Sequence, residues 1–120
     1  MSAVVTTEYC QWETFNASCP AGWVVLMQTA LYGRMRHGRC ADTDVYIGCS
    51  TDVTSEMDTR CSGHRECTVA IPDSVMHKQQ PCPSDMMAYL EASYMCIRGK
   101  QLKKLSHVIT AYASQNDTWF

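Results

Sequence analysis

Cysteine has the clearest chemistry in this 120-residue sequence, because eight cysteines can either form disulfides or bind metal. Structural zinc sites use Cys or His pairs two to four residues apart. No Cys-x-x-Cys occurs here, and the closest pair, Cys61 and Cys67, is more widely spaced. An even number of cysteines at this density is typical of proteins from oxidising compartments. We therefore predict disulfides, an extracellular location and no metal site. The cysteines are Cys10, Cys19, Cys40, Cys49, Cys61, Cys67, Cys82 and Cys96.

Catalytic motifs are missing from the sequence. It contains no Gly-x-Ser-x-Gly and no His-Glu-x-x-His, and disulfide formation would leave no cysteine as a nucleophile. The histidines are scattered, mostly among charged residues and without ligand spacing, which favours solvated positions for His37, His64, His77 and His107. We predict no enzyme activity and no cofactor.

Composition restricts the class of protein further. A hydrophobic content of 46% is typical of a globular chain and excludes general disorder, and the length suits one domain. The net charge of −2 argues against nucleic-acid binding. No stretch approaches the ~20 apolar residues of a membrane span, so we expect no membrane insertion. Residues 1–9 lack the pattern of a signal peptide. If the protein is secreted, we expect a removed leader, or one domain of a larger receptor.

The elements that must position any site are short. Residues 23–32 are apolar and rich in β-formers, and residues 67–71 and 89–97 alternate, so we predict three strands there. Helices are expected over 51–60 and over 73–79, each beginning at a capping Thr, Asp or Ser. The predicted fold is mainly β with short helices (α+β), a compact antiparallel β-sandwich with long disulfide-linked loops.

The chain changes character near residue 99. No internal repeat or linker divides residues 9–97. After that point the cysteines stop, and lysines are interleaved with Leu, Val and Ile. Residues 99–120 therefore form a tail, a linker or an amphipathic helix, of which we favour the tail or linker.

Three stretches of the sequence resemble a known family. They are ALYGR at 30–34, CSGHREC at 61–67, and PCP at 81–83 followed by YLEASYMC at 89–96. Together with the cysteine series, they are similar to the galactose/rhamnose-binding lectin domain of the sea-urchin egg lectin type. Fish-egg rhamnose-binding lectins and the lectin-like domain of latrophilins share this domain. The resemblance covers residues 8–98.

The resemblance carries implications for the cysteines and for the Tyr-Gly-Arg motif. It implies the disulfides Cys10–Cys40, Cys19–Cys96, Cys49–Cys82 and Cys61–Cys67, whereas sequence alone leaves the connectivity open. It also implies that Tyr32, Gly33 and Arg34 contribute to a carbohydrate site. An equally weighted alternative is structural: Gly33 serves a turn, Tyr32 packs, and Arg34 donates to loop carbonyls.

Other positions of the implied carbohydrate site depart from the family pattern. Gln11 follows the first cysteine where the family has Glu, although Glu13 lies close by. Gln80 replaces the Asp before Pro-Cys, with Asp85 as a possible substitute, and Ala88 replaces a Lys. The departures remove charge-assisted hydrogen bonds, which are roughly twice as strong as neutral ones. We therefore expect weak sugar binding, altered specificity or none.

Tryptophan and asparagine add smaller hypotheses. Trp12 and Trp23 flank cysteines, where covering the core is the commoner role; Trp12 is the better candidate for stacking because it lies in a short Cys-bounded loop. Asn16 and Asn116 begin Asn-x-Ser/Thr sequences and are candidate glycosylation sites.

Two functions remain open. The first is recognition of a cell-surface glycan of the galactose or rhamnose class, without catalysis. The second is a protein-interaction module that binds a cell-surface protein through the same scaffold, as the likeness to latrophilins implies.

Overall fold

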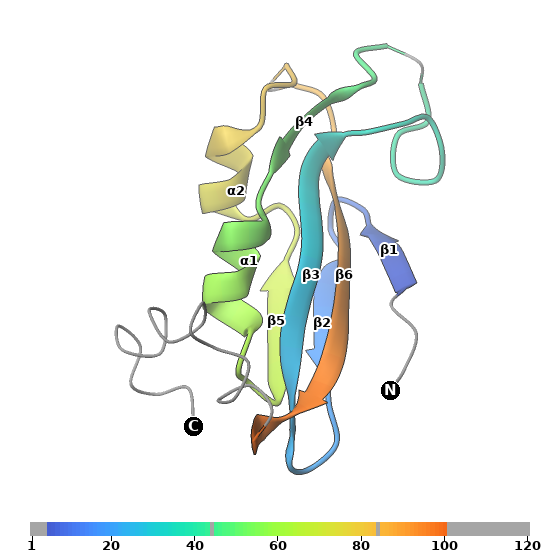
Figure 1. Ribbon diagram of the computed structural model, residues 1–120. Coiled ribbons are helices and arrows are strands. Elements are labelled where there is room, and N and C mark those ends of the chain that lie inside the picture. Colours follow the sequence, from blue (N-terminus) through green and yellow to red (C-terminus); the bar gives the residue numbers. More distant parts are fainter. Residues whose placement is uncertain (1–4, 44, 84, 101–120) are drawn as a thin grey trace.

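The computed structural model describes residues 5–43, 45–83 and 85–100 (Figure 1). It confirms the predicted fold class, because antiparallel strands dominate and the helices are short. The elements are β1 (Val5–Tyr9), β2 (Thr14–Ser18), β3 (Trp23–Arg34), β4 (Cys49–Asp52), α1 (Thr54–Cys61), β5 (Glu66–Ala70), α2 (Ser74–Gln79) and β6 (Tyr89–Arg98).

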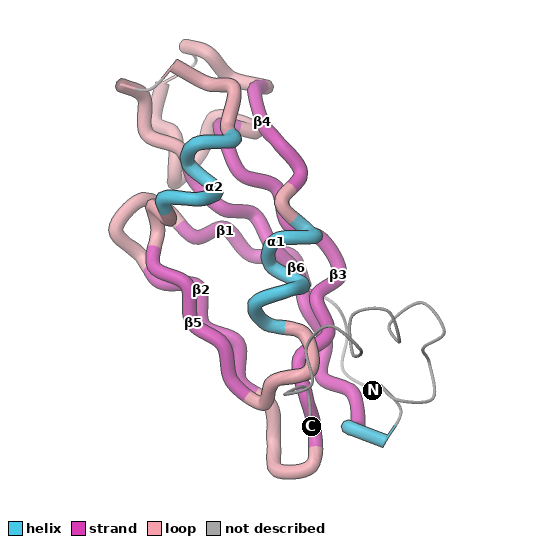
Figure 2. The backbone as a smooth tube through the Cα atoms, turned by 90° about the vertical axis from the view of Figure 1, so that its left-hand side faces the viewer, coloured by secondary structure: helices cyan, strands magenta, loops and turns pink. Residues whose placement is uncertain are grey.

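The strands form two antiparallel sheets. One sheet has the order β1-β6-β3-β4, and the other pairs β2 with β5. Figure 2 shows the β2–β5 pair as a layer of its own beside the longer strands. β3 and β6 are the central strands of the larger sheet, so the residues at their ends hold the connecting loops.

The core lies between the two sheets and beneath the helices. Alternate residues of β2, β3, β5 and β6 point into it, as the period of two requires. One cluster of buried side chains contains residues of both sheets and both helices. It includes Phe15, Val25, Val53, Met57, Val69, Met76, Leu90 and Ala92. The buried residues of α1 are Met57 and Cys61, so this helix packs on the core with one side.

Two boundaries differ from the sequence prediction by two residues or more, and the others by at most one. β3 continues through Arg34, and α1 begins at Thr54 instead of within 51–53. The reason is that β4 pairs with the end of β3, Leu31 lying opposite Asp52, so these residues are extended. Asp52 still accepts from the Thr54 N–H at 2.8 Å, but from outside the helix. The sequence prediction did not include β1, β2 or β4.

Four disulfides join the elements, and all eight cysteines belong to them. The pairs are Cys10–Cys40, Cys19–Cys96, Cys49–Cys82 and Cys61–Cys67, the same pairs that the resemblance implies. Cys19–Cys96 connects the end of β2 to β6 and therefore links the two sheets. In the part of the chain that the structure describes, no helix has the length and apolarity to cross a bilayer. Residues 101–120, including Asn116, lie outside that part.

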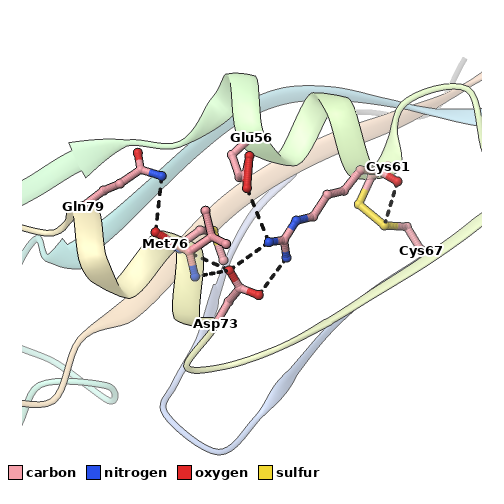
Figure 3. Close-up of polar contacts among 8 residues, drawn as sticks. Glu56, Cys61, Cys67, Asp73, Met76 and Gln79 are labelled. Carbon is pink, nitrogen blue, oxygen red and sulfur yellow. Dashed lines mark hydrogen bonds and ion pairs between the residues drawn. A yellow bond between two sulfur atoms is a disulfide. The ribbon is translucent and has the colours of Figure 1, made fainter. Parts of the chain in front are cut away.

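Asp73 connects the two helices. As predicted, it caps α2, accepting from the backbone N–H groups of Val75 and Met76 at 3.1 Å each. Its oxygens also accept from the Arg60 guanidinium of α1 at 2.8 and 2.9 Å (Figure 3). The Arg60 hydrogen bonds hold the pKa of the Asp73 carboxyl below its ordinary value. One carboxylate thus orients both helices over the core.

Replacing Asp73 with alanine is expected to lower the free energy of unfolding by about 1–2 kcal/mol at pH 7, because the helix cap is lost. Since its folded-state pKa is depressed, the carboxylate stabilises fully above about pH 4 and loses this effect as pH falls through the folded-state pKa. Denaturant unfolding of both proteins at pH 7 and pH 2.5 tests this. The difference between them should shrink in acid, and Asp42→Ala, at an exposed loop aspartate, should show neither effect. A pH-independent difference contradicts the assignment.

Candidate functional site

Three strands bring the residues predicted for the site to one end of the larger sheet. Leu90 lies opposite both Tyr9 of β1 and Tyr32 of β3, and Gly33 lies opposite Tyr89. The end of β1, the end of β3 and the start of β6 therefore meet. We call this region, residues 10–13, 34–43, 45–48, 80–83 and 85–89, the loop end.

Tyr32 and Gly33 are buried at the loop end. The Tyr32 hydroxyl hydrogen-bonds to His77 Nδ1 at 2.9 Å, and burial raises the pKa of Tyr32 to about 12. Gly33 faces the backbone of β4, where a Cβ would lie 2.3 Å from the Cys49 carbonyl oxygen. Only glycine permits this approach. Both residues therefore have structural roles: the Tyr32 hydroxyl is hydrogen-bonded inside the protein, and Gly33 packs against the β4 backbone.

Arg34 joins two loops from the inside. Only 2% of its surface is exposed. One Nη donates to the Met87 carbonyl at 2.7 Å, and the other donates to the Thr43 hydroxyl and the Val45 carbonyl, each at 3.2 Å. This geometry favours the structural alternative for Tyr32 and Arg34, but the turn expected at Gly33 is wrong, because Gly33 lies within β3 and pairs with both β4 and β6. Arg34 positions the loops before β4 and before β6, and any influence on a ligand passes through them.

The remaining predicted residues divide by exposure. Ala88 is buried in the core, and Gln80 uses its Oε1 to accept from the Cys82 N–H at 2.8 Å. Asp85 and Glu13 are exposed, and Gln11 is half-buried. Of the polar groups predicted for the site, those of Glu13 and Asp85 therefore face solvent most directly, and Gln11 and Gln80 are half-buried.

Glu13 connects the loop end to a feature that the sequence analysis missed. Its carboxylate accepts from the Cys10 N–H and from Arg39, each at 2.8 Å, and the Arg39 hydrogen bond holds the pKa of Glu13 below its usual value. Arg39 lines an open groove of about 620 Å³ on the outer face of β1 and β6. The groove is formed by Thr6, Thr7, Glu8, Arg36, Arg39 and Glu91.

Two carboxylates hold Arg36 in this outer groove. Its guanidinium donates with both Nη atoms to Glu91, and one of them also reaches Glu8 Oε2 at 3.2 Å. The Glu91 hydrogen bonds raise the pKa of Arg36 above its ordinary value. The buried Tyr89 hydroxyl fixes the backbone, accepting from the Arg36 N–H at 3.0 Å. The outer groove therefore presents acceptors and donors in a fixed arrangement, which suits hydroxyl pairs.

Part of this groove could have been found from the sequence. The alternation over 89–97 places Glu91 on the face away from Leu90, and a charged residue there must face solvent or a partner. Glu8 becomes its neighbour only through the pairing of β1 with β6, and Arg36 and Arg39 lie in an irregular loop. Within the described residues, no group of three or more His, Cys, Asp or Glu is arranged to hold a metal ion.

The fold, its disulfides and its buried Tyr-Gly-Arg motif define a lectin-type domain. A profile of the D-galactoside/L-rhamnose binding SUEL lectin domain matches residues 17–96, and the chain belongs to this family. The chain is 31% identical over 101 residues to Latrophilin-like protein 1 of Caenorhabditis elegans, which covers 80% of this chain but 10% of that protein. It is 30% identical over 92 residues to the D-galactoside-specific lectin of Heliocidaris crassispina, covering 72% of this chain and 85% of that lectin.

Arg34→Lys is expected to lower the free energy of unfolding by about 2–3 kcal/mol, because one ammonium group cannot reach both loops and leaves carbonyls unpaired. Amide exchange should also accelerate at residues 45–48 and 85–88. Lys78→Arg, which makes the reverse exchange at an exposed position of α2, is the control and should change neither quantity. An Arg34→Lys protein with unchanged stability and loop exchange would show that the guanidinium does not hold the loops.

Proposed function

We propose that this chain is an extracellular or cell-surface recognition domain that binds carbohydrate of the galactose/rhamnose class, weakly or with altered specificity, and catalyses no reaction. Membership of the SUEL lectin family supports the ligand class. Four disulfides in a small domain support an oxidising compartment. The match to part of a latrophilin-like protein supports a place within a larger receptor.

The outer groove is the observation that carries this proposal. A neutral sugar offers vicinal hydroxyls, which need paired acceptors and donors. Glu8 and Glu91 supply the acceptors, Arg36 and Arg39 supply the donors, and Thr6 and Thr7 add hydroxyls. Two positive and two negative charges balance, which favours a neutral ligand over a strongly charged one. Gln11, Glu13, Gln80 and Asp85 remain predicted contributors from the adjoining loop end.

The same arrangement explains why we expect weak binding. Arg36 and Arg39 already donate to carboxylates, so a sugar hydroxyl must share those partners or replace water around them. The groove is open, and the Arg36 and Arg39 side chains are more than half exposed, so their guanidinium groups stay hydrated until a ligand arrives. We expect a monosaccharide dissociation constant in the millimolar range, which corresponds to about 4 kcal/mol of binding free energy.

A protein-binding function is the second candidate, and a separate observation favours it. Val45, Tyr46 and Met87 are large apolar residues with 52%, 60% and 44% of their surfaces exposed. They lie on the two loops that Arg34 joins. Exposed aromatic and methionine side chains are enriched in protein interfaces. In this alternative, the partner is another cell-surface protein.

Glycosylation of Asn16 is compatible with either function. Asn16 is exposed on β2, and Ser18 of the same sequence is exposed two residues later. We propose that Asn16 is modified when the protein is secreted. A glycan there would project from the smaller sheet, away from the groove that β1 and β6 form.

An NMR titration of the oxidised domain with galactose, rhamnose and an unrelated sugar tests the function. Saturable shifts should cluster at residues 6–8, 36–39 and 91, with millimolar affinity. Glu8→Gln should weaken binding by about fivefold or more, because a charge-assisted acceptor is lost. Glu66→Gln, which makes the same change on exposed β5, should leave affinity unchanged.

The outcomes separate the two candidates. Silent spectra at tens of millimolar sugar would reject simple-sugar binding and favour a protein partner. Saturable shifts confined to residues 11–13 and 80–88 would retain a lectin function but place it at the loop end instead of in the outer groove. A submicromolar constant for a simple sugar would contradict the site as proposed.

A further inference from the structure

Trp12 occupies a backbone position that usually belongs to glycine. The Glu13 N–H donates to the Cys10 carbonyl at 3.0 Å, closing a four-residue turn with Trp12 in its third position. The φ angle of Trp12 is +74°. A turn with a positive φ at this position is of type II, which favours Gly or Asn there. For a bulky side chain, left-handed backbone is strained.

Burial does not compensate for this strain. The Trp12 side chain is 80% exposed, the highest value among the large hydrophobic residues exposed in the described part of the chain. The common role of such a tryptophan, covering the core, is therefore not its role here. Trp23 behaves differently: it is half-buried and lies under the Arg98 guanidinium, 5.1 Å from the ring centroid.

The turn holds Trp12 in place despite its exposure. The Trp12 N–H donates to the Ile71 carbonyl at 2.8 Å, which ties the turn to the end of β5. The Cys10–Cys40 disulfide anchors the start of the turn. Glu13 then accepts from both the Cys10 N–H and Arg39. An exposed indole on a rigid support loses little entropy when a ligand covers it.

The surroundings of Trp12 indicate the chemistry of that ligand. Its neighbours along the chain, Gln11, Glu13 and Thr14, are polar, and Glu13 pairs with Arg39 of the outer groove. Protein interfaces gather several apolar anchors in a desolvated centre. A pyranose ring instead combines one apolar C–H face with a rim of hydroxyls. A single aromatic ring among hydrogen-bonding groups matches the sugar better than the protein surface.

We propose that Trp12 is an aromatic platform that stacks on the apolar face of a pyranose ring and thereby helps to determine which glycans bind. The strained turn is the means by which the ring is presented. This inference rests on the proposed carbohydrate function. It adds Trp12, from the turn that follows β1, to the polar groups of the groove. Tyr46, also aromatic, exposed and at positive φ (+56°), provides a comparison.

The test is a titration of the oxidised domain with galactose and lactose, following the Trp12 indole N–H signal, which Trp12→Gly identifies by removing it. Sugar should shift this signal saturably. Trp12→Gly should weaken affinity by about fivefold or more. The same substitution should raise the thermal midpoint by a few degrees, because glycine adopts the positive φ freely. Tyr46→Gly makes the matching backbone change and should leave affinity unchanged.

Each result decides a separate question. Unchanged sugar affinity in Trp12→Gly, with weaker binding in Glu8→Gln, would overturn the platform and leave the proposed function standing. A lower thermal midpoint in Trp12→Gly would show that the indole stabilises the fold, which also overturns the inference. An equal loss of affinity in Tyr46→Gly would attribute the effect to loop loosening instead of the indole. No binding by the unaltered domain would contradict the carbohydrate function itself.

Discussion

The antiparallel pairing of β3 with β6 is the constraint on which the rest of the structure depends. It runs from Trp23 opposite Arg98 to Gly33 opposite Tyr89 and is interrupted by a shift between Met27 and Thr29. Because strand side chains alternate, this register sends Leu90 and Ala92 into the core and Glu91 to the outer face. A slip of one residue would turn the carboxylate of Glu91 from its ion pair with Arg36 into the apolar core and turn Leu90 out of the core, which the hydrophobic effect and the cost of burying an unpaired charge oppose.

The same pairing fixes the loop end. Gly33 allows β4 to approach β3 at a distance that no Cβ permits, and Arg34 then lies where its guanidinium meets carbonyls from both neighbouring loops. A buried guanidinium is stable only when hydrogen bonds replace its hydration. The loops must therefore keep their carbonyls turned inward. Val45 and Met87, whose carbonyls accept from Arg34, expose their side chains, so a motif hidden from solvent can organise a surface.

Sequence reasoning could predict those features that depend on local pattern. An apolar, β-forming composition identified the strand that became β3, and alternation identified β5 and β6; Asp73 was one of two residues that could be recognised as the cap of α2. It could not predict β4, because CSTD has little apolar content and is extended only by pairing with β3. The groove could not be predicted for a similar reason: Glu8 and Glu91 are distant in sequence and meet only through the register of β1 on β6, and Arg36 reaches them from an irregular loop.

Buried residues stabilise this fold, whereas exposed residues are available to a ligand, and this difference bears on the specificity of the domain. The residues most tightly defined by packing, Tyr32, Gly33 and Arg34, are committed to hydrogen bonds or close contacts inside the protein. Ion pairs as exposed as that of Arg39 with Glu13 contribute little to stability, so folding places few demands on them. Recognition can therefore change through exposed side chains at the rim while the core motif stays the same. In this chain Ala88 at the loop end is buried and uncharged, whereas Arg36 and Arg39 supply exposed charge on the outer face. In such a scaffold, one set of residues, inside the protein, stabilises the fold, and another set, on the surface, selects the ligand.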